Sequence, residues 1–184
     1  MSYFRKTIFT GRNFRRQCSC IKFRKVKKIK ILKNHTAQAF NIRYSLETNC
    51  IYTSFGDGNF AICSLDTIDL IKIRKLCVEK VRNIDFNYTT SEIAIDSADY
   101  TIRIFDIKTL QEKKNFVGHK ISSNTVHFST DGKSLLTGGR DGYLNIWQVG
   151  NYKIIKSIPA NEWAIYDIAY SHNSNLFATA RRYK

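Results

Sequence analysis

The sequence repeats itself with a constant period of 42 residues. Large apolar residues recur at that spacing in two series: Ile42, Ile84, Val126 and Ile168, and Tyr44, Phe86, Phe128 and Tyr170. Members of the two series lie two residues apart, so their side chains leave the same face of an extended strand. Four copies in constant register indicate a fold built from equal units, each of which buries its apolar face against the next.

Each unit is predicted to contain four short antiparallel strands. The strands expected in the first full unit are residues 39–44, 50–55, 59–64 and 68–74. One aspartate keeps the period in the tight turn before each third strand: Asp57, Asp99 and Asp141. One lysine keeps it on each fourth strand: Lys72, Lys114 and Lys156. Lysine on an outer strand discourages pairing between molecules, and we interpret these residues as a solvated face.

At these positions the chain resembles the WD-repeat family of β-propellers. The third unit carries the resemblance in Gly118, His119, Thr137, Asp141 and Trp147. The resemblance implies that the last four of these side chains form a buried hydrogen-bonded tetrad, in line with the cost of burying unpaired polar groups. It also implies an all-β fold, an incomplete β-propeller of four-stranded antiparallel blades.

The tetrad is retained only in part in the other units. By register, the first unit has His35, Thr53 and Asp57, the second keeps Asp99, and the fourth keeps Thr179. We therefore expect a partial tetrad in the first blade and substituted networks elsewhere.

The strand count predicts about three full blades and parts of two others. We expect a basic N-terminal leader at residues 1–21, poorly ordered or a degenerate strand, and a propeller arc over residues 22–184. The repeat stops inside the last unit, and propellers close with about 4 to 8 blades. We therefore expect a truncated fragment of a larger propeller, or a chain that associates with itself or with another propeller segment.

The sequence favours a protein without catalytic function. The four histidines lack metal-ligand spacing, and the five cysteines contain no Cys-x-x-Cys pair, so neither a metal nor a cofactor is expected. We interpret His127 as an ordinary polar residue, because it faces the opposite side of its strand from its two apolar neighbours.

The family resemblance implies a protein–protein interaction scaffold. Its members bind protein or peptide partners through loops at one mouth of the ring, and exposed Arg and Trp are enriched at binding hot spots. The candidate contacts are Lys120, Arg140, Trp163, Arg181 and Arg182. The competing interpretation, that Trp163 packs between blades and the charges are only solvated, stays open.

The charge distribution supplies an alternative function. The formal net charge is +15, and residues 1–33 hold 12 of the 30 Lys and Arg residues without any acidic residue. Aromatic residues lie among these charges, so this segment could bind RNA or another polyanion by charge and stacking.

The expected location is the cytoplasm, with no membrane partner. No run of about 18 apolar residues is present, and the start lacks the apolar core of a secretory signal. The first 20 residues are rich in Arg and free of acids, so targeting to an organelle is the alternative.

Overall fold

The computed structural model describes residues 37–160, 162–171 and 176–181, together with the backbone of residues 7–10, 18–22 and 27–32. Every regular element in these ranges is a β-strand. No helix in the described part of the chain is long and apolar enough to span a membrane.

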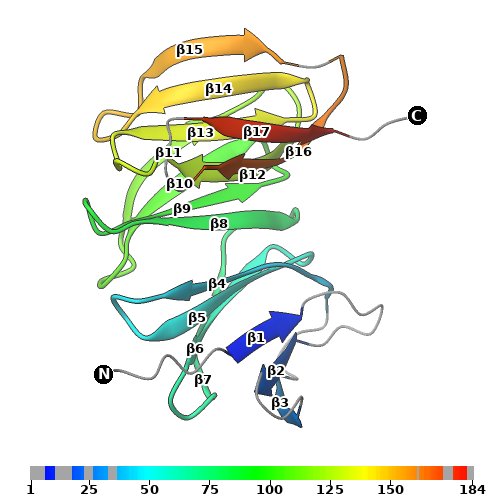
Figure 1. The fold of residues 1–184 in the computed structure, drawn as a ribbon, viewed down its shortest axis with the longest axis vertical. Coiled ribbons are helices and arrows are strands. Elements are labelled where there is room, and N and C mark those ends of the chain that lie inside the picture. The colour runs from blue at the N-terminus through cyan, green and yellow to red at the C-terminus, as the bar shows by residue number, and fades with distance from the viewer. Residues whose placement is uncertain are drawn as a thin grey trace.

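Three complete antiparallel sheets, here called blades, follow each other along the chain (Figure 1). The first blade consists of β4 (Ala39–Ser45), β5 (Cys50–Phe55), β6 (Asn59–Ser64) and β7 (Leu70–Lys75). The second consists of β8 (Val81–Asn87), β9 (Glu92–Ser97), β10 (Thr101–Asp106) and β11 (Glu112–Val117). The third consists of β12 (Ser123–Phe128), β13 (Ser134–Gly139), β14 (Tyr143–Gln148) and β15 (Ile154–Pro159). Strands pair in sequence order within each blade, as the repeat predicts.

Two smaller sheets flank the three blades. β16 (Ile165–Tyr170) pairs with β17 (Phe177–Arg181), and β16 contacts β12 and β13 of the third blade. β1 (Thr7–Thr10), β2 (Cys18–Lys22) and β3 (Lys27–Leu32) form a three-stranded sheet at the other end of the arc. No sheet among the described residues joins β17 to β1–β3, so the predicted incomplete propeller is confirmed.

Part of the predicted leader takes part in this pairing. β1 and most of β2 lie within residues 1–21, and the two strands pair with each other. The division into a leader and an arc stays a prediction.

The core lies between successive blades rather than within one. The second and third strands of each blade are largely buried. Tyr52 and Ile62 of the first blade pack with Ile84 and Phe105 of the second, and Ile104 on the other face of the second blade packs against the third. Full burial of such a side chain stabilises the fold by about 1.5–3 kcal/mol, so stacking of blades supplies the main stabilisation.

The fourth strands form the outer rim of the arc. β7, β11 and β15 are largely exposed, and Lys72, Lys114 and Lys156 are exposed as predicted. This rim contributes little to the core.

Successive antiparallel strands place their connections alternately at two ends of each blade. We call one end of the third blade, with residues 118–122 and 140–142, the loop end. The opposite end, with residues 129–133 and 149–153, is the turn end. Ser123 pairs with Gly139, which places the 118–122 and 140–142 connections together.

Candidate functional site

The four tetrad side chains predicted in the third blade meet at the loop end. Trp147 Nε1 donates to Thr137 Oγ1 at 3.0 Å, and Thr137 Oγ1 lies 2.8 Å from His119 Nε2. His119 Nδ1 in turn lies 3.0 Å from Asp141 Oδ1. The Asp141 carboxylate can only accept, so the ring proton of His119 is on Nδ1 and is donated to Asp141. Nε2 then carries no proton and accepts the hydrogen bond that the Thr137 hydroxyl donates. The tetrad is therefore a continuous chain of hydrogen bonds from strand β14 to the loop end.

Asp141 also fixes the backbone of both loops. Its carboxylate accepts hydrogen bonds from the backbone N–H groups of Lys120 at 3.0 Å and Tyr143 at 3.2 Å. Gly139 is required beside it, because a Cβ at this position would overlap His119 Nδ1 and Asp141 Oδ1. The loop end of the third blade is thus held on a rigid polar base.

The imidazole of His119 is neutral in this arrangement. Burial lowers its pKa, and the nearby Asp141 carboxylate reverses this only in part. A neutral ring carries a single proton, as the hydrogen-bond chain requires.

The second blade replaces the tetrad with an ion pair that the sequence reasoning missed. Arg103 Nη2 lies 2.7 Å from Asp99 Oδ2, and Arg103 Nη1 donates to Ser97 Oγ at 2.7 Å. Burial raises the pKa of Asp99, but hydrogen bonds from Arg103, Ser97 and Thr101 more than reverse this and hold it well below its ordinary value. The available signal was an arginine in the middle of the apolar strand β10, where a charge needs a buried partner.

The first blade shows less of the predicted partial tetrad. His35 lies outside the described residues. Thr53 is fully buried, and its hydroxyl has no hydrogen-bond partner among the described residues. Asp57 accepts a hydrogen bond from the backbone N–H of Asn59 at 3.1 Å.

Those predicted partner-binding residues that the structure describes lie at the loop end. Lys120 and Arg140 are exposed on the two loops of the third blade, and Arg181 is exposed at the end of β17. Trp163 is 45% exposed in the connection that leads into β16. Arg182 lies outside the described residues. The structure therefore brings the described candidates to one end of two adjacent sheets.

Polar side chains at 42-residue spacing link the innermost strands of the three blades to β16 of the last sheet. Asn41 Nδ2 donates to Asn83 Oδ1 at 2.8 Å, and Asn83 Nδ2 donates to Thr125 Oγ1 at 2.9 Å. Thr125 Oγ1 in turn donates a hydrogen bond to Asp167 Oδ1 at 3.4 Å. The sequence signal was a polar residue repeated at period 42, one position before each apolar Ile or Val of the repeat.

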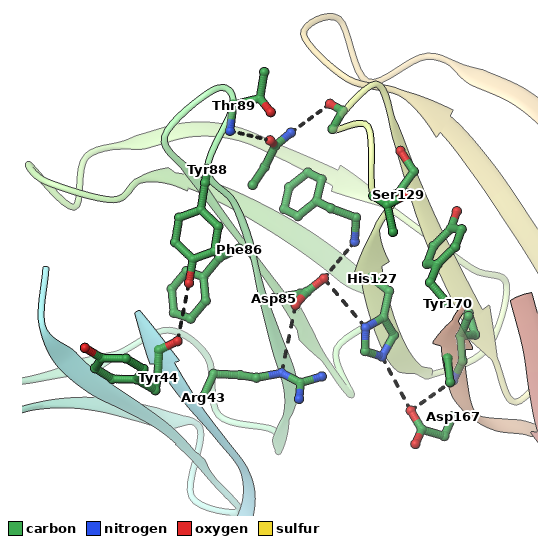
Figure 2. A pocket seen from close by; sticks show the side chains of 16 residues that line it. Arg43, Tyr44, Asp85, Phe86, Tyr88, Thr89, His127, Ser129, Asp167 and Tyr170 are labelled. Carbon is green, nitrogen blue, oxygen red and sulfur yellow. Dashed lines mark hydrogen bonds and ion pairs between the residues drawn. The ribbon is translucent and has the colours of Figure 1, made fainter. Parts of the chain in front are cut away.

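A second row, two residues further along β4, β8 and β12, carries charge (Figure 2). Arg43 Nε lies 3.9 Å from Asp85 Oδ1. His127 stands between two carboxylates, with Nδ1 3.6 Å from Asp85 Oδ2 and Nε2 3.4 Å from Asp167 Oδ1. The interpretation of His127 as an ordinary polar residue was wrong, because neighbouring innermost strands place an acid on each side of it.

A pocket of about 680 Å³ opens over this charged row at the turn end. It is lined by the innermost strands and by the turns that follow them, including Tyr44, Tyr88 and Tyr170. Among the described residues, no group of three or more His, Cys, Asp or Glu side chains is arranged to hold a metal ion.

Comparison with known proteins agrees with the repeat. Residues 110–148 match the family model "WD domain, G-beta repeat". The chain is 28% identical to the Caenorhabditis elegans protein "Small ribosomal subunit protein RACK1" over 50% of this chain and 29% of that protein. It is 26% identical to the Dictyostelium discoideum "U5 small nuclear ribonucleoprotein 40 kDa protein" over 66% of this chain and 34% of that protein. The chain thus spans about a third or less of the length of these relatives.

The fold also matches solved structures. A chain in the crystal structure of the mitotic checkpoint complex superposes with a TM-score of 0.80 over 90% of this chain and 51% of that chain, at 15% sequence identity. At this identity the match shows the fold alone. The repeat model over residues 110–148, the relatives and the superposed blades all agree with the resemblance of this chain to the WD-repeat proteins.

Proposed function

We propose that the protein is a non-catalytic interaction scaffold that binds protein partners through the loop end. The observation that carries this proposal is the support of that surface: Asp141 holds the backbone of both loops, while Lys120 and Arg140 extend from them into solvent. Side chains on a fixed backbone lose less conformational entropy on binding, and exposed Arg and Trp are common binding anchors. Trp163 and Arg181 extend the same surface onto the next sheet.

The relatives support an interaction role of this kind inside the cell. Their printed names place one in a ribosomal subunit and another in a small nuclear ribonucleoprotein, both assemblies of many components. For this chain we propose the same general class of role and a cytoplasmic location.

A pair of matched variants tests the proposal. The loop-end variant carries Lys120→Ala, Arg140→Ala and Trp163→Ala, and the control carries Lys133→Ala and Lys153→Ala at the turn end of the same third blade. Proteins crosslinked to the wild-type chain in cells are identified by mass spectrometry, and the affinities of those partners are then measured with purified proteins. We expect the affinity of the loop-end variant to fall by at least about tenfold for each anchor removed and the control to keep its partners. Equal retention by both variants would refute the proposal.

We also propose that the last sheet is covered by further propeller strands, through self-association or from another propeller segment. β17 has only one neighbouring strand among the described residues. Its apolar residues Phe177, Ala178 and Ala180 are exposed. Exposed strand edges and apolar faces favour pairing with another chain. A monodisperse, cooperatively melting monomer in sedimentation and calorimetry would contradict this.

The charge distribution favours a second candidate, binding of RNA or another polyanion by residues 1–33. Each phosphate that such a segment neutralises steepens the fall of log affinity with log salt by about 0.7–0.9. The test is RNA affinity across a salt series for the wild-type chain and for a chain whose Lys and Arg in this segment are replaced by Gln. A salt-independent affinity, or one unchanged by the replacement, would exclude this function.

A further inference from the structure

The pocket at the turn end has a charged floor and aromatic walls (Figure 2). Asp85, His127 and Asp167 form the floor, each from a different innermost strand. Tyr44 and Tyr88 lie on one side of it and Tyr170 on the other. The pocket lies at the opposite end of the blades from the loop end, so it is independent of the surface proposed above.

The protonation of His127 depends on the charges at the floor. The side chain is only 12% exposed. Burial lowers its pKa, but the carboxylates of Asp167 and Asp85 more than reverse this and raise the pKa to about 8, against the opposing charge of Arg43. Asp96 of β9 is the further acid that interacts with this imidazole. The acids at the floor therefore stabilise the charged ring, and above about pH 8, where His127 loses its proton, the two carboxylates are balanced by Arg43 alone.

Asp167 has one oxygen available for a ligand. Its Oδ1 accepts a hydrogen bond from the backbone N–H of Ile168 at 2.9 Å and lies 3.4 Å from both Thr125 Oγ1 and His127 Nε2. Oδ2 forms no hydrogen bond or ion pair with the described residues, and the side chain is 67% exposed. The neighbouring His127 lowers the pKa of Asp167, which therefore stays ionised at neutral pH.

The walls suit a cation with apolar neighbours. Tyr44 and Tyr88 are 39% and 45% exposed, and aromatic faces attract ammonium and guanidinium groups. Leu46, whose backbone nitrogen lies 3.4 Å from the Tyr88 hydroxyl, and Leu176, whose carbonyl accepts a hydrogen bond from the backbone of Ser171, are 63% and 71% exposed. Exposed apolar side chains beside a charged group offer contacts to the apolar residues of a protein segment.

The site is also held in place before any ligand arrives. Asn87 Nδ2 donates to the carbonyl of Gly132 at 2.8 Å, which ties together the turns of the second and third blades. The Tyr88 hydroxyl lies 3.4 Å from the carbonyl of Tyr44 and 3.4 Å from the backbone nitrogen of Leu46 in the first blade. A preformed site costs less conformational entropy on binding.

We propose that this pocket binds an arginine or lysine side chain of a protein segment. The Asp167 carboxylate pairs with the bound cation, the tyrosine rings enclose it, and Leu46 and Leu176 contact the apolar residues that flank it in the segment.

Three capped synthetic peptides test the charge requirement on the full chain. They share the sequence Leu-Ser-Gly-Xaa-Gly-Ser-Leu, with arginine, neutral citrulline or glutamate at the central position. Amide chemical shifts are followed during titration. We expect the arginine peptide to bind at least about tenfold more tightly than the citrulline peptide, because only it forms the ion pair and the cation–π contact. Its shifts should map to Tyr44, Tyr88 and Asp167. No binding at millimolar concentration, equal binding of the citrulline peptide, or tighter binding of the glutamate peptide would overturn the proposal.

The variant Asp167→Asn tests the assigned partner of the cation. It should abolish the preference for arginine over citrulline, while the control Glu112→Gln, at an exposed position on the outer strand β11, leaves it unchanged. Thermal unfolding of both variants reports whether the fold is kept. A preference retained in folded Asp167→Asn would contradict the role given to this carboxylate.

The pH dependence gives an independent readout. Loss of the His127 proton as the pH rises through about 8 removes a positive charge from the floor. The affinity for the arginine peptide should therefore rise over this range, and His127→Gln should abolish the rise. A falling affinity would mean that the pocket selects anions.

Discussion

The Thr137 hydroxyl is the central link of the tetrad, and its removal measures what the tetrad contributes to stability. Thr137→Val keeps the volume and the β-branched shape and removes Oγ1, which contacts Trp147 Nε1 at 3.0 Å and His119 Nε2 at 2.8 Å. Both ring nitrogens remain buried after the substitution. Each buried polar group left without a partner costs about 1–3 kcal/mol, so we expect the free energy of unfolding to fall by roughly 2–5 kcal/mol.

The first blade supplies a matched control at the same register position. Thr53 is also fully buried, but its hydroxyl has no hydrogen-bond partner among the described residues. Thr53→Val therefore removes no hydrogen bond within the described part of the chain, and we expect a change within about 0.5 kcal/mol or a small gain in stability.

Urea unfolding followed by far-ultraviolet circular dichroism compares the two variants. An unchanged m value shows that the same transition is measured in each. The reasoning is refuted if the two variants lose the same free energy, or if Thr137→Val costs less than about 1 kcal/mol.

Three further substitutions test other polar contacts. Arg103→Met leaves the Asp99 carboxylate without its guanidinium and should lower the free energy of unfolding by about 2–4 kcal/mol. In a double-mutant cycle, adding Asp99→Asn should recover part of this loss. Strictly additive losses would contradict a direct pair. Tyr152→Phe removes a 2.6 Å hydrogen bond to the buried Glu92 between two blades and should lower the unfolding free energy by about 1–3 kcal/mol in urea, with no change if the bond contributes nothing. Burial raises the pKa of Asp96 to about 7, so its protonated form stabilises the fold fully below about pH 4 and this contribution is lost as the pH rises through 7. Asp96→Asn should therefore reduce the drop in urea midpoint between about pH 5 and pH 8, and an identical drop would refute this.

Much of the fold could be predicted because a repeat states the same local pattern several times. The expected strands at 50–55 and 59–64 agree with β5 and β6 at both ends. Alternation of side chains along a strand and the chemistry of the Asp turns depend only on neighbours in sequence. Such features are readable from the chain alone.

The candidate sites were less accessible to this reasoning. Side chains of the predicted tetrad in the third blade meet as the resemblance implies, yet Arg103 and the row around His127 were missed. Their partners come from other strands or other blades, and spacing along one strand does not reveal which side chains face each other across two sheets. The periodic polar positions of the innermost strands were visible, but their pairing depends on the stacking of blades.

The sequence by itself determined the four-strand plan of the three blades, the blade repeat and the polar residues that each blade carries. These follow from local periodicity and from turn chemistry. The tertiary structure decided which polar groups became partners, since the stacking of blades brings Asp85, His127 and Asp167 from three sheets to one pocket floor. The charge and protonation of these groups depend on distances between sheets. Those distances are set only when the blades pack, so they cannot be read from the order of residues.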